Sequence, residues 1–403
     1  MSLRTKFFDK VDSLSSELVE LTRDMIRTPS ENPPGDERAV SGLVSERLEA
    51  IGFDVELVES EPRRVNTLGT LKGAGGGRNF LFNGHYDTVP VGNLDFWSVD
   101  PFGGLVKDGR IYGRGSGDMK GAIASAIIAA KALDEAGIRL DGNFMIHCVA
   151  DEETFGRYGT RYLAEKGYVT SRNVDMAVVG EGSVKDDVVH ARTAVRGRVL
   201  VNILVRGKSA HSSRPQDGVN AVLKMGKVLL AINDHGFNFP PHHLLPAPTI
   251  APGTVIKGGT KDNVIPELCE AICDVRIVPG MTVEGVLGEV RSVVDGLMED
   301  DPELAVEVTS PLNKPPSEIS ASDELFKIAD RAVRATAGYE LKPVGTSGSN
   351  DTSWLTTIAK IPAMAFGPGG GNAHGADEWA SIGMLVDFAK IYGLMAMEIC
   401  VVK

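Results

Sequence analysis

Apolar residues near the start of the chain recur every three or four positions, which is the period of an amphipathic helix. The residues that define this predicted helix are Phe7, Val11, Leu14, Leu18, Leu21 and Met25. A second such stretch covers about Glu37–Ile51, and MKGAIASAIIAAKALDEAG predicts a third, strongly apolar helix. The short, continuously apolar runs NFMIHCVA and VDMAVVG are typical of strands covered on both faces in a parallel sheet. Helices and strands that alternate in this way predict an α/β domain.

The pattern changes near residue 194. RVLVNILVRG alternates apolar and polar residues, and the following segments predict a helix, two strands, a helix and a final strand. This βαββαβ order is the ferredoxin-like pattern of a small α+β domain. From about residue 310 the α/β pattern returns with DELFKIADRAVRATAG and IPAMAFGPG. We therefore expect a small domain, 194–310, inserted into a larger domain made of 1–193 and 311–403.

Composition narrows the classes of partner. The 403 residues exceed the size that one hydrophobic core usually serves, which agrees with two domains. A formal net charge of −12 disfavours a nucleic-acid partner, which would call for a basic patch. No apolar run reaches the roughly 18 residues of a membrane span, and the initial MSLRTKFFDK lacks the apolar segment of a signal peptide. Four cysteines without metal-binding spacing fit a reducing compartment, so we expect a cytoplasmic protein with no membrane partner.

Histidines and carboxylates follow several of the predicted strands. His85 ends NFLFNGH, Glu152 and Glu153 follow FMIHCVAD, Glu181 ends DMAVVGE, and His374 lies beyond PAMAFGPGGGNAH. In an open α/β sheet, ligands bind outside the carboxyl ends of the strands. These side chains can therefore converge although they are far apart in the sequence.

Two aspartates extend this candidate set. Asp118 precedes the long apolar helix, where an aspartate can simply cap the helix N-terminus. Asp87 lies two residues after His85, close enough to accept the second ring N–H of that histidine and fix its tautomer. A single histidine at a strand end is more often a hydrogen-bonded residue than a metal ligand. Two histidines with three or four carboxylates, however, form the mixed nitrogen and oxygen ligand set of a hydrolytic zinc site, with one glutamate left as a base.

Six segments occur in the order found in a known family of dinuclear zinc amidohydrolases: GHYDTVP, GRGSGDMKG, ADEETFG, VVGEGS, VRGKSAHSSRPQDGVNA and GPGGGNAHGADEW. The chain resembles this family, peptidase family M20, which includes acetylornithine deacetylase, succinyl-diaminopimelate desuccinylase, aminoacylase and peptidases of the carboxypeptidase G type. The resemblance covers nearly the whole chain. It implies a zinc-exopeptidase-like catalytic domain with a mixed, mainly parallel sheet, and it identifies the inserted ferredoxin-like domain as a lid and dimerisation domain.

The resemblance also implies two zinc ions per subunit, which cobalt can replace. The implied ligands are His85 and Glu181 at one site, Glu153 and His374 at the other, and Asp118 as the bridge between them. A cis peptide bond at 118–119 is a further expectation from the family. The metals would lower the pKa of a shared water molecule and polarise the scissile carbonyl.

The catalytic and substrate-binding groups come from the same resemblance. Glu152 would be the general base that deprotonates the bridging water, with Asp87 as a supporting catalytic residue, and His211 would stabilise the tetrahedral oxyanion. Asn263 and Arg276 would contact the substrate, with Arg276 as a clamp for its carboxylate. In the family the inserted domains of two chains pair, so we expect a homodimer in which His211 reaches the metal centre of the other subunit.

The reaction implied is hydrolysis of the amide bond in an N-acyl amino acid, and the alternative is a dipeptidase or glutamate carboxypeptidase of the same family. GTSGSNDTSWL, residues 345–355, is expected to line the pocket, with Ser349 and Asn350 as substrate contacts. Desuccinylases resemble G-T-S-D-G-R-F at this loop. The absence of that arginine here lowers the desuccinylase interpretation without removing it.

Two alternatives belong to other classes. A non-catalytic binding or regulatory member of the family would have lost a ligand or the base, and none of these residues is missing. A dinuclear phosphoesterase could use a similar ligand set. It would not need His211 and Arg276 poised for an amide that carries a carboxylate.

Overall fold

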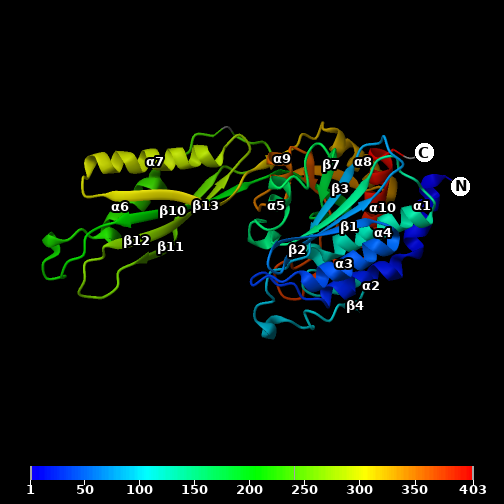
Figure 1. The fold of residues 1–403 in the computed structure, drawn as a ribbon, viewed down its shortest axis with the longest axis horizontal. Coiled ribbons are helices and arrows are strands. Elements are labelled where there is room, and N and C mark those ends of the chain that lie inside the picture. Colours follow the sequence, from blue (N-terminus) through cyan, green and yellow to red (C-terminus); the bar gives the residue numbers. More distant parts are fainter. Residues whose placement is uncertain (1, 240, 402–403) are drawn as a thin grey trace. The chain divides into compact units, whose positions relative to one another are not determined.

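The computed structural model describes residues 2–239 and 241–401 and divides into two compact units. The larger unit contains residues 1–193, 318–344 and 350–403, and the inserted unit contains 194–317 and 345–349 (Figure 1). Each unit has its own hydrophobic core. The fold class expected from the sequence is confirmed: an α/β unit with a large mixed sheet accompanies a smaller α+β unit.

A ten-stranded sheet forms the centre of the larger unit. Four neighbouring strands pair in parallel, in the order β6 (Phe144–Val149), β3 (Phe80–His85), β7 (Met176–Val179) and β16 (Ala363–Ala365). Antiparallel pairings border these four parallel strands on both sides. The flanking strands are β1 (Asp54–Glu61), β2 (Arg64–Leu71), β8 (Ser183–Lys185), β9 (Val188–Val195), β14 (Ser317–Glu318) and β15 (Glu340–Thr346).

Both faces of the parallel strands are buried, which explains their continuously apolar sequences. In β3, Phe80 and Phe82 belong to the core that contains the long helices, whereas Leu81 belongs to a second core on the other face. The same alternation places Met176 and Val178 of β7 in the first core. The helices of this unit are α1 (Leu3–Ser13), α2 (Ser15–Ile26), α3 (Arg38–Ile51), α4 (Gly121–Glu135), α5 (Thr160–Glu165), α8 (Glu324–Ala337), α9 (Thr352–Thr357) and α10 (Ile382–Ile399).

The first apolar stretch of the sequence forms two helices rather than one. α1 ends and α2 begins around Leu14, whose backbone (φ −94°, ψ 4°) leaves the helical conformation for one residue. The apolar positions on both helices still face the same core. Within the described part of the chain, no helix combines the length and apolar character needed to span a bilayer.

Short elements connect the sheet to the loops that carry the candidate site. A small separate sheet contains β4 (Leu105–Lys107), β5 (Arg110–Tyr112) and β17 (Trp379–Ser381). Single helical turns lie at η1 (Leu94–Phe96), η2 (Ser116–Lys120) and η3 (Glu152–Thr154), and a further turn, η4 (Pro215–Asp217), lies in the inserted unit.

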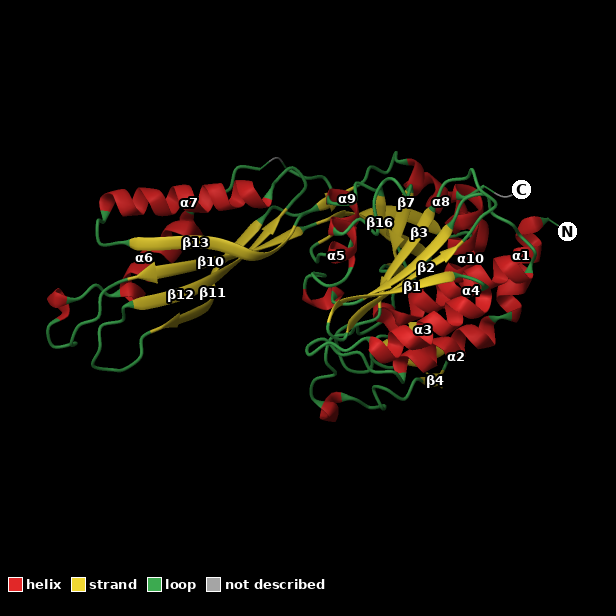
Figure 2. Cartoon of the chain, viewed as in Figure 1, coloured by secondary structure: helices red, strands yellow, loops and turns green. Residues whose placement is uncertain are grey.

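The inserted unit has the predicted βαββαβ order. Its elements are β10 (Gly197–Arg206), α6 (Ala221–Asp234), β11 (Thr249–Gly258), β12 (Leu268–Ile277), α7 (Val283–Asp300) and β13 (Ala305–Lys314). The four strands form an antiparallel sheet in the order β11, β12, β10, β13, and both helices cover one face of it (Figure 2). β13 pairs with β10 as far as Lys314, so this strand runs past residue 310, where the sequence pattern suggested the inserted segment would end.

Candidate metal centre

Strand order brings the candidate residues to one edge of the large sheet. His85 is the last residue of β3, and Glu152 and Glu153 form the turn η3 that follows β6. Glu181 follows β7, and His374 lies in the segment between β16 and β17. Because β6, β3, β7 and β16 are neighbours and parallel, their carboxyl ends lie at the same edge. We call this set of residues, together with Asp118, the carboxyl-edge cluster.

Asp118 lies between two histidines of the cluster. Its Oδ1 is 3.1 Å from His85 Nε2, and its Oδ2 is 3.3 Å from His374 Nε2. His374 Nε2 is also 3.3 Å from Glu153 Oε1. The two carboxylate oxygens of Asp118 thus face different histidines, which is the arrangement required of a bridging ligand.

The ligand atoms form two overlapping groups. Within each group, atoms of the three side chains all lie within 4.8 Å of one another: His85, Asp118 and Glu153 in one, and His85, Glu152 and Glu181 in the other. His85 belongs to both groups. The Glu152 carboxylate therefore lies at the same edge as the ligand candidates, within reach of whatever they hold.

The turn η2 presents Asp118 at the start of α4. Asp118 (φ −136°, ψ 92°) does not have a helical backbone, so it is not an ordinary residue of the first helical turn. The peptide bond between Asp118 and Met119 is cis, as the family resemblance implies. Gly115 precedes this turn with φ +84°, a left-handed conformation that favours glycine.

Asp87 holds two parts of the cluster together. His85 Nδ1 is 2.9 Å from the main-chain oxygen of Asp87 and 3.6 Å from its Oδ1, which leaves Nε2 facing Asp118. The Asp87 carboxylate also accepts hydrogen bonds from the main-chain N–H groups of Glu152 and Glu153, at 3.1 and 3.3 Å. Burial opposes ionisation of Asp87, but its hydrogen bonds with His85 and Asn32 lower its pKa. The sequence suggested the contact with His85 and missed the support of the Glu152–Glu153 turn.

Burial makes the cluster costly to ionise without a cation. It raises the pKa of Glu153 to about 7 and that of Glu181 to about 8, and the negative charge of Asp118 acts in the same direction. Contacts with Asp118 and Glu153 raise the pKa of His374 to about 10. Burial alone would lower the pKa of His85, but the carboxylates of Asp118 and Asp87 raise it well above its ordinary value. Burial is thus the main cause of the shifts of the two glutamates, and neighbouring carboxylates cause those of the two histidines.

Glu181 tests whether the cluster fits a metal ion. Its Oε2 accepts a hydrogen bond of 2.9 Å from Arg192 Nη1. Its Oε1 is buried and has no hydrogen-bond partner among the described residues. A buried carboxylate oxygen without a donor is rare, because leaving it unsatisfied costs about 1 to 3 kcal/mol or more. A divalent cation would satisfy that oxygen and offset the charge, and the nitrogen and oxygen donors present suit zinc.

Other buried residues that the sequence pattern did not indicate also support the cluster. Arg64 Nη2 is 2.8 Å from Asp151 Oδ1, immediately before the Glu152–Glu153 turn. Glu378 accepts hydrogen bonds from the main-chain N–H groups of Gly117 and Asp118. Glu378 lies within the quoted segment GPGGGNAHGADEW, so its position was visible there although its contacts were not.

In the inserted unit, the candidate residues contact their own neighbours. His211 is exposed, and its Nδ1 lies 2.8 Å from Ser213 Oγ and accepts a 3.1 Å hydrogen bond from the Ser213 N–H. The Asn263 main-chain oxygen accepts a hydrogen bond from the Ser212 N–H, and its side-chain Oδ1 is buried without a partner among the described residues. Arg276 Nε and Nη2 bind the two oxygens of Asp274 at 2.7 and 3.3 Å.

The loop with Ser349 and Asn350 is divided between the units. Ser349 is half-buried and ends the segment 345–349 of the inserted unit. Asn350 is buried in the larger unit, where its Oδ1 accepts hydrogen bonds from the Thr352 N–H at 3.2 Å and the Thr352 hydroxyl at 2.6 Å. Its Nδ2 has no partner among the described residues. Asn350 therefore binds Thr352, the first residue of α9, through its oxygen, and its amide nitrogen keeps unused donors.

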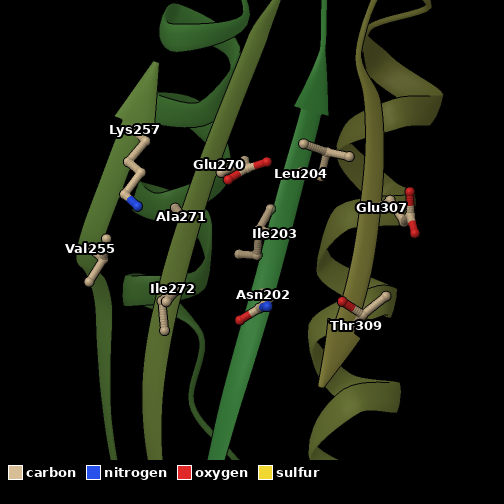
Figure 3. Close-up of a pocket in the computed structure, with 10 residues that line it drawn as sticks. All are labelled: Asn202, Ile203, Leu204, Val255, Lys257, Glu270, Ala271, Ile272, Glu307 and Thr309. Atoms are coloured by element: carbon tan, nitrogen blue, oxygen red, sulfur yellow. The ribbon is translucent and has the colours of Figure 1, made fainter. Parts of the chain in front are cut away.

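A separate hollow of about 250 Å³ lies on the sheet face of the inserted unit (Figure 3). Its ionisable side chains are Lys257, Glu270 and Glu307, and the remainder are apolar or neutral. Lys257 pairs across the strands with Glu270. No histidine lines this hollow, so it does not compete with the carboxyl-edge cluster as a reaction centre.

The fold and the cluster together define a metal-dependent hydrolase, and comparison with known proteins identifies its family. The model of peptidase family M20/M25/M40 matches residues 81–398, so the chain belongs to this family. A succinyl-diaminopimelate desuccinylase from Parvibaculum lavamentivorans is 30% identical over 388 residues, covering 93% of each chain. N-formyl-4-amino-5-aminomethyl-2-methylpyrimidine deformylase from Bacillus subtilis is 27% identical and covers 95% of this chain and 94% of its own.

Solved structures agree on the fold. A dinuclear metal binding peptidase of the M20 family from Bacillus subtilis superimposes with a TM-score of 0.72 at 17% sequence identity. The match covers 96% of this chain and 99% of that chain. The two-unit architecture is therefore that of the family.

Proposed function

We propose that the protein is a deacylase that hydrolyses the amide bond of an N-acyl amino acid, as acetylornithine deacetylase and succinyl-diaminopimelate desuccinylase do. The observation that carries the proposal is Asp118, whose two oxygens face His85 and His374 at 3.1 and 3.3 Å. That geometry supports a pair of metal ions at the carboxyl edge. The desuccinylase relative supports a deacylase over nearly the full length of the chain.

Two zinc ions per subunit fit the carboxyl-edge cluster, and cobalt can replace them. His85 and Glu181 would hold one ion, Glu153 and His374 the other, and Asp118 both. When bound, the ions lower the pKa of a water molecule and polarise the scissile carbonyl. Arg192 keeps one oxygen of Glu181 occupied, so the other remains for the ion.

The protein's own residues then carry the proton and orient the substrate. Glu152 accepts the proton of the attacking water and later delivers it to the leaving amine, so the products are a carboxylate and an amine. Asp87 accepts hydrogen bonds from the N–H groups of the turn that carries Glu152, and these bonds hold the turn in place. His211 stabilises the oxyanion of the tetrahedral state, and Arg276 binds the substrate carboxylate. Asn263, Ser349 and Asn350 complete the proposed substrate contacts.

A second candidate function is a dipeptidase or carboxypeptidase of the same chemistry. The peptidase from Bacillus subtilis favours it, because its fold matches this chain over nearly its full length. The deformylase relative points the other way, towards removal of a small acyl group. The substrate is in either case a small molecule that carries an amide bond.

We further propose that the larger unit, expected from the sequence as 1–193 and 311–403, is the catalytic domain, and that the inserted unit, expected as 194–310, is a lid through which two chains dimerise. Strand β11 lies at the edge of the inserted sheet and is mostly exposed. Leu223 and Leu230 of α6 are 69% and 67% exposed, which is unusual for large apolar side chains on one helix. An open strand edge beside apolar side chains supports pairing of two identical units. All four cysteines are free and buried, which supports a cytoplasmic location.

The proposal is tested with the purified full chain, first freed of metal by a chelator and then loaded with zinc or cobalt. We expect hydrolysis of N-acetyl, N-succinyl or N-formyl amino acids to disappear without metal and to return on loading. A parallel panel of dipeptides separates the deacylase from the peptidase. Full activity in protein that contains no measurable metal would contradict the mechanism.

A further inference from the structure

Glu378 is a buried carboxylate whose two oxygens are both occupied. Oε1 accepts hydrogen bonds from the main-chain N–H groups of Gly117 and Asp118, at 3.0 and 3.1 Å. Oε2 accepts a 2.6 Å hydrogen bond from Arg114 Nη1. The Glu378 and Arg114 side chains are only 1% and 2% exposed. With three N–H donors already bound, Glu378 is not itself a ligand candidate.

The contact joins two segments that each carry a cluster residue. Asp118 stands in η2, and His374 lies four residues before Glu378 in the sequence. The main chains of these segments touch: a Cβ added to Gly117 would lie 3.1 Å from Gly370 Cα. The Gly113 N–H also donates to the Glu378 main-chain oxygen at 2.8 Å. Glu378 therefore connects the segment of the bridging aspartate to the segment of a terminal histidine.

Charge separates Glu378 from the other carboxylates nearby. Burial raises its pKa, and the bond from Arg114 acts against that shift. Paired with the Arg114 guanidinium, it adds no net negative charge beside the carboxyl-edge cluster. Arg114 is itself fixed, because its Nη2 lies 3.4 Å from the Pro90 main-chain oxygen and its main-chain N–H donates to Pro101. The pair is a rigid anchor rather than an additional ligand.

We propose that Glu378 is a positioning residue for the metal bridge: it fixes the main chain of Asp118 so that each carboxylate oxygen faces its own metal site. This inference rests on the proposed dinuclear function. The physical reason is that the aspartate side chain is short and has only two rotatable bonds. The position of its main chain, which the N–H contact holds, therefore limits where its two oxygens can lie. Glu378 thereby sets the separation of the two sites, because the same segment also places His374.

The test compares metal binding by the full-length wild type, Glu378→Gln and Glu378→Asp. In Glu378→Gln the side chain has one oxygen and one NH2 group. The NH2 group must face either the two main-chain N–H donors or Arg114, so one of these contacts becomes donor against donor. In Glu378→Asp the charge opposite Arg114 is kept, but the shorter side chain cannot reach both main-chain donors. Loss of a group that orients a metal ligand typically weakens metal affinity about 10- to 100-fold, and we expect this loss for cobalt in both variants.

The matched control is Glu37→Gln. Glu37 is another fully buried glutamate paired with an arginine, with Oε1 2.9 Å from Arg64 Nη1, and its pKa is raised to about 8 by burial. The Gly117 and Asp118 N–H groups both donate to Glu378, so Glu37 lies outside this contact. We expect Glu37→Gln to lower the melting temperature while leaving cobalt affinity within about threefold of the wild type, because Arg64 keeps its separate 2.8 Å contact with Asp151 through Nη2.

Cobalt also allows a measurement, the magnetic coupling between two bound ions, that a general loss of stability does not change. Two cobalt ions that share Asp118 are magnetically coupled, so we expect weaker coupling in both Glu378 variants at full cobalt loading, measured by electron paramagnetic resonance. Wild-type affinity together with a wild-type spectrum in the two variants would overturn the inference. So would an equal loss of affinity in Glu37→Gln. Wild-type protein that binds only one cobalt would instead overturn the proposed dinuclear function.

Discussion

In the larger unit, the candidate side chains stand on neighbouring strand ends and are held by buried partners, as Asp87 holds the turn of Glu152 and Glu153. In the inserted unit, the candidates lie on exposed or half-buried positions. The His211 ring binds Ser213, and Arg276 is held by Asp274. The first arrangement fixes ligand positions before anything binds. The arrangement in the inserted unit leaves polar side chains at its surface, where they can contact groups outside the core of that unit.

This difference predicts different losses on mutation. Changes at the carboxyl-edge cluster should alter metal content or turnover, because its geometry is built into the large sheet. Changes in the inserted unit should leave metal content intact and alter substrate affinity or the stabilisation of the transition state.

The strongest contrast lies within one turn of the larger unit. Glu152→Gln should leave folding and metal content almost unchanged and lower turnover by about 10²- to 10⁴-fold or more, because it removes the general base. Glu153→Gln should instead weaken metal binding, since Glu153 Oε1 lies 3.3 Å from His374 Nε2 within the ligand set. Turnover and bound metal are measured on the same samples. Equal metal content in the two variants would show that the division of roles between these residues is wrong.

His211 tests whether the inserted unit acts on the partner subunit. His211→Ala should lower turnover by about 10²- to 10³-fold with metal content unchanged, as expected for loss of one oxyanion donor. Mixing this inactive chain with inactive Glu152→Ala chains should restore up to about half the activity per mixed dimer, because one of its two sites then has both residues. Mixed dimers that form but remain inactive would show that His211 serves its own chain or has no catalytic part.

Arg276 should affect substrate affinity more than turnover. Arg276→Lys keeps the charge but loses the paired donors that bind a carboxylate, so KM should rise by about 10-fold or more while metal content stays constant. Arg198→Lys is the matched control, because Arg198 also binds Asp274, with Nε 2.8 Å from Oδ2. A similar rise in KM in both variants would assign the effect to the shape of the sheet rather than to Arg276.

The smallest expected effect is the pH dependence of the metal-free protein. The folded pKa values of Glu153, Glu181 and His374, about 7, 8 and 10, all lie above their ordinary values of 4.5, 4.5 and 6.5. Their contribution to stability is therefore complete at low pH and is lost as the pH rises through the folded values. We expect the melting temperature of the metal-free protein to fall by on the order of 5 °C between about pH 6 and about pH 9.

Zinc should reverse that fall, because it takes the place of the protons at these side chains. Calorimetry of metal-free and zinc-loaded protein at both pH values measures the difference. Glu181→Gln carries no ionisable group at that position and should show a smaller fall. A melting temperature of the metal-free protein that rises over this interval would contradict the charge balance described for the cluster.

The sequence was most informative where local pattern and strand order decide position. Apolar runs followed by His85, Glu152 and Glu181 predicted strand ends. Strands that are buried on both faces are typical of a parallel sheet, in which the carboxyl ends of neighbouring strands lie at one edge. The βαββαβ order of the inserted unit could likewise be predicted, because each element has its own period. The antiparallel pairing on both sides of the four parallel strands could not be predicted, since the flanking strands carry no sequence mark of their direction.

Contacts between segments distant in the sequence could not be predicted from the sequence. Nothing in the pattern around Glu378 indicates that its oxygens bind N–H groups of residues 117 and 118. The support that Asp87 gives to the turn after β6 depends on β3 and β6 being neighbours. The contact of the Asn350 oxygen with the first residue of α9 also appears only in the fold, because a structural asparagine and a substrate contact look alike in sequence.

The late position of β16 in the sequence has a consequence for synthesis of the chain. β7 ends at residue 179, and its parallel neighbour begins at residue 363, after the whole inserted unit has been made. At typical elongation rates of about 5 to 20 residues per second, the edge of β7 stays unpaired on the ribosome for about 10 to 40 s. An open strand edge invites association with other chains. Stalled chains that end near residue 310 should therefore aggregate or recruit chaperones more than chains that include β16, as sedimentation of the released nascent chains would measure.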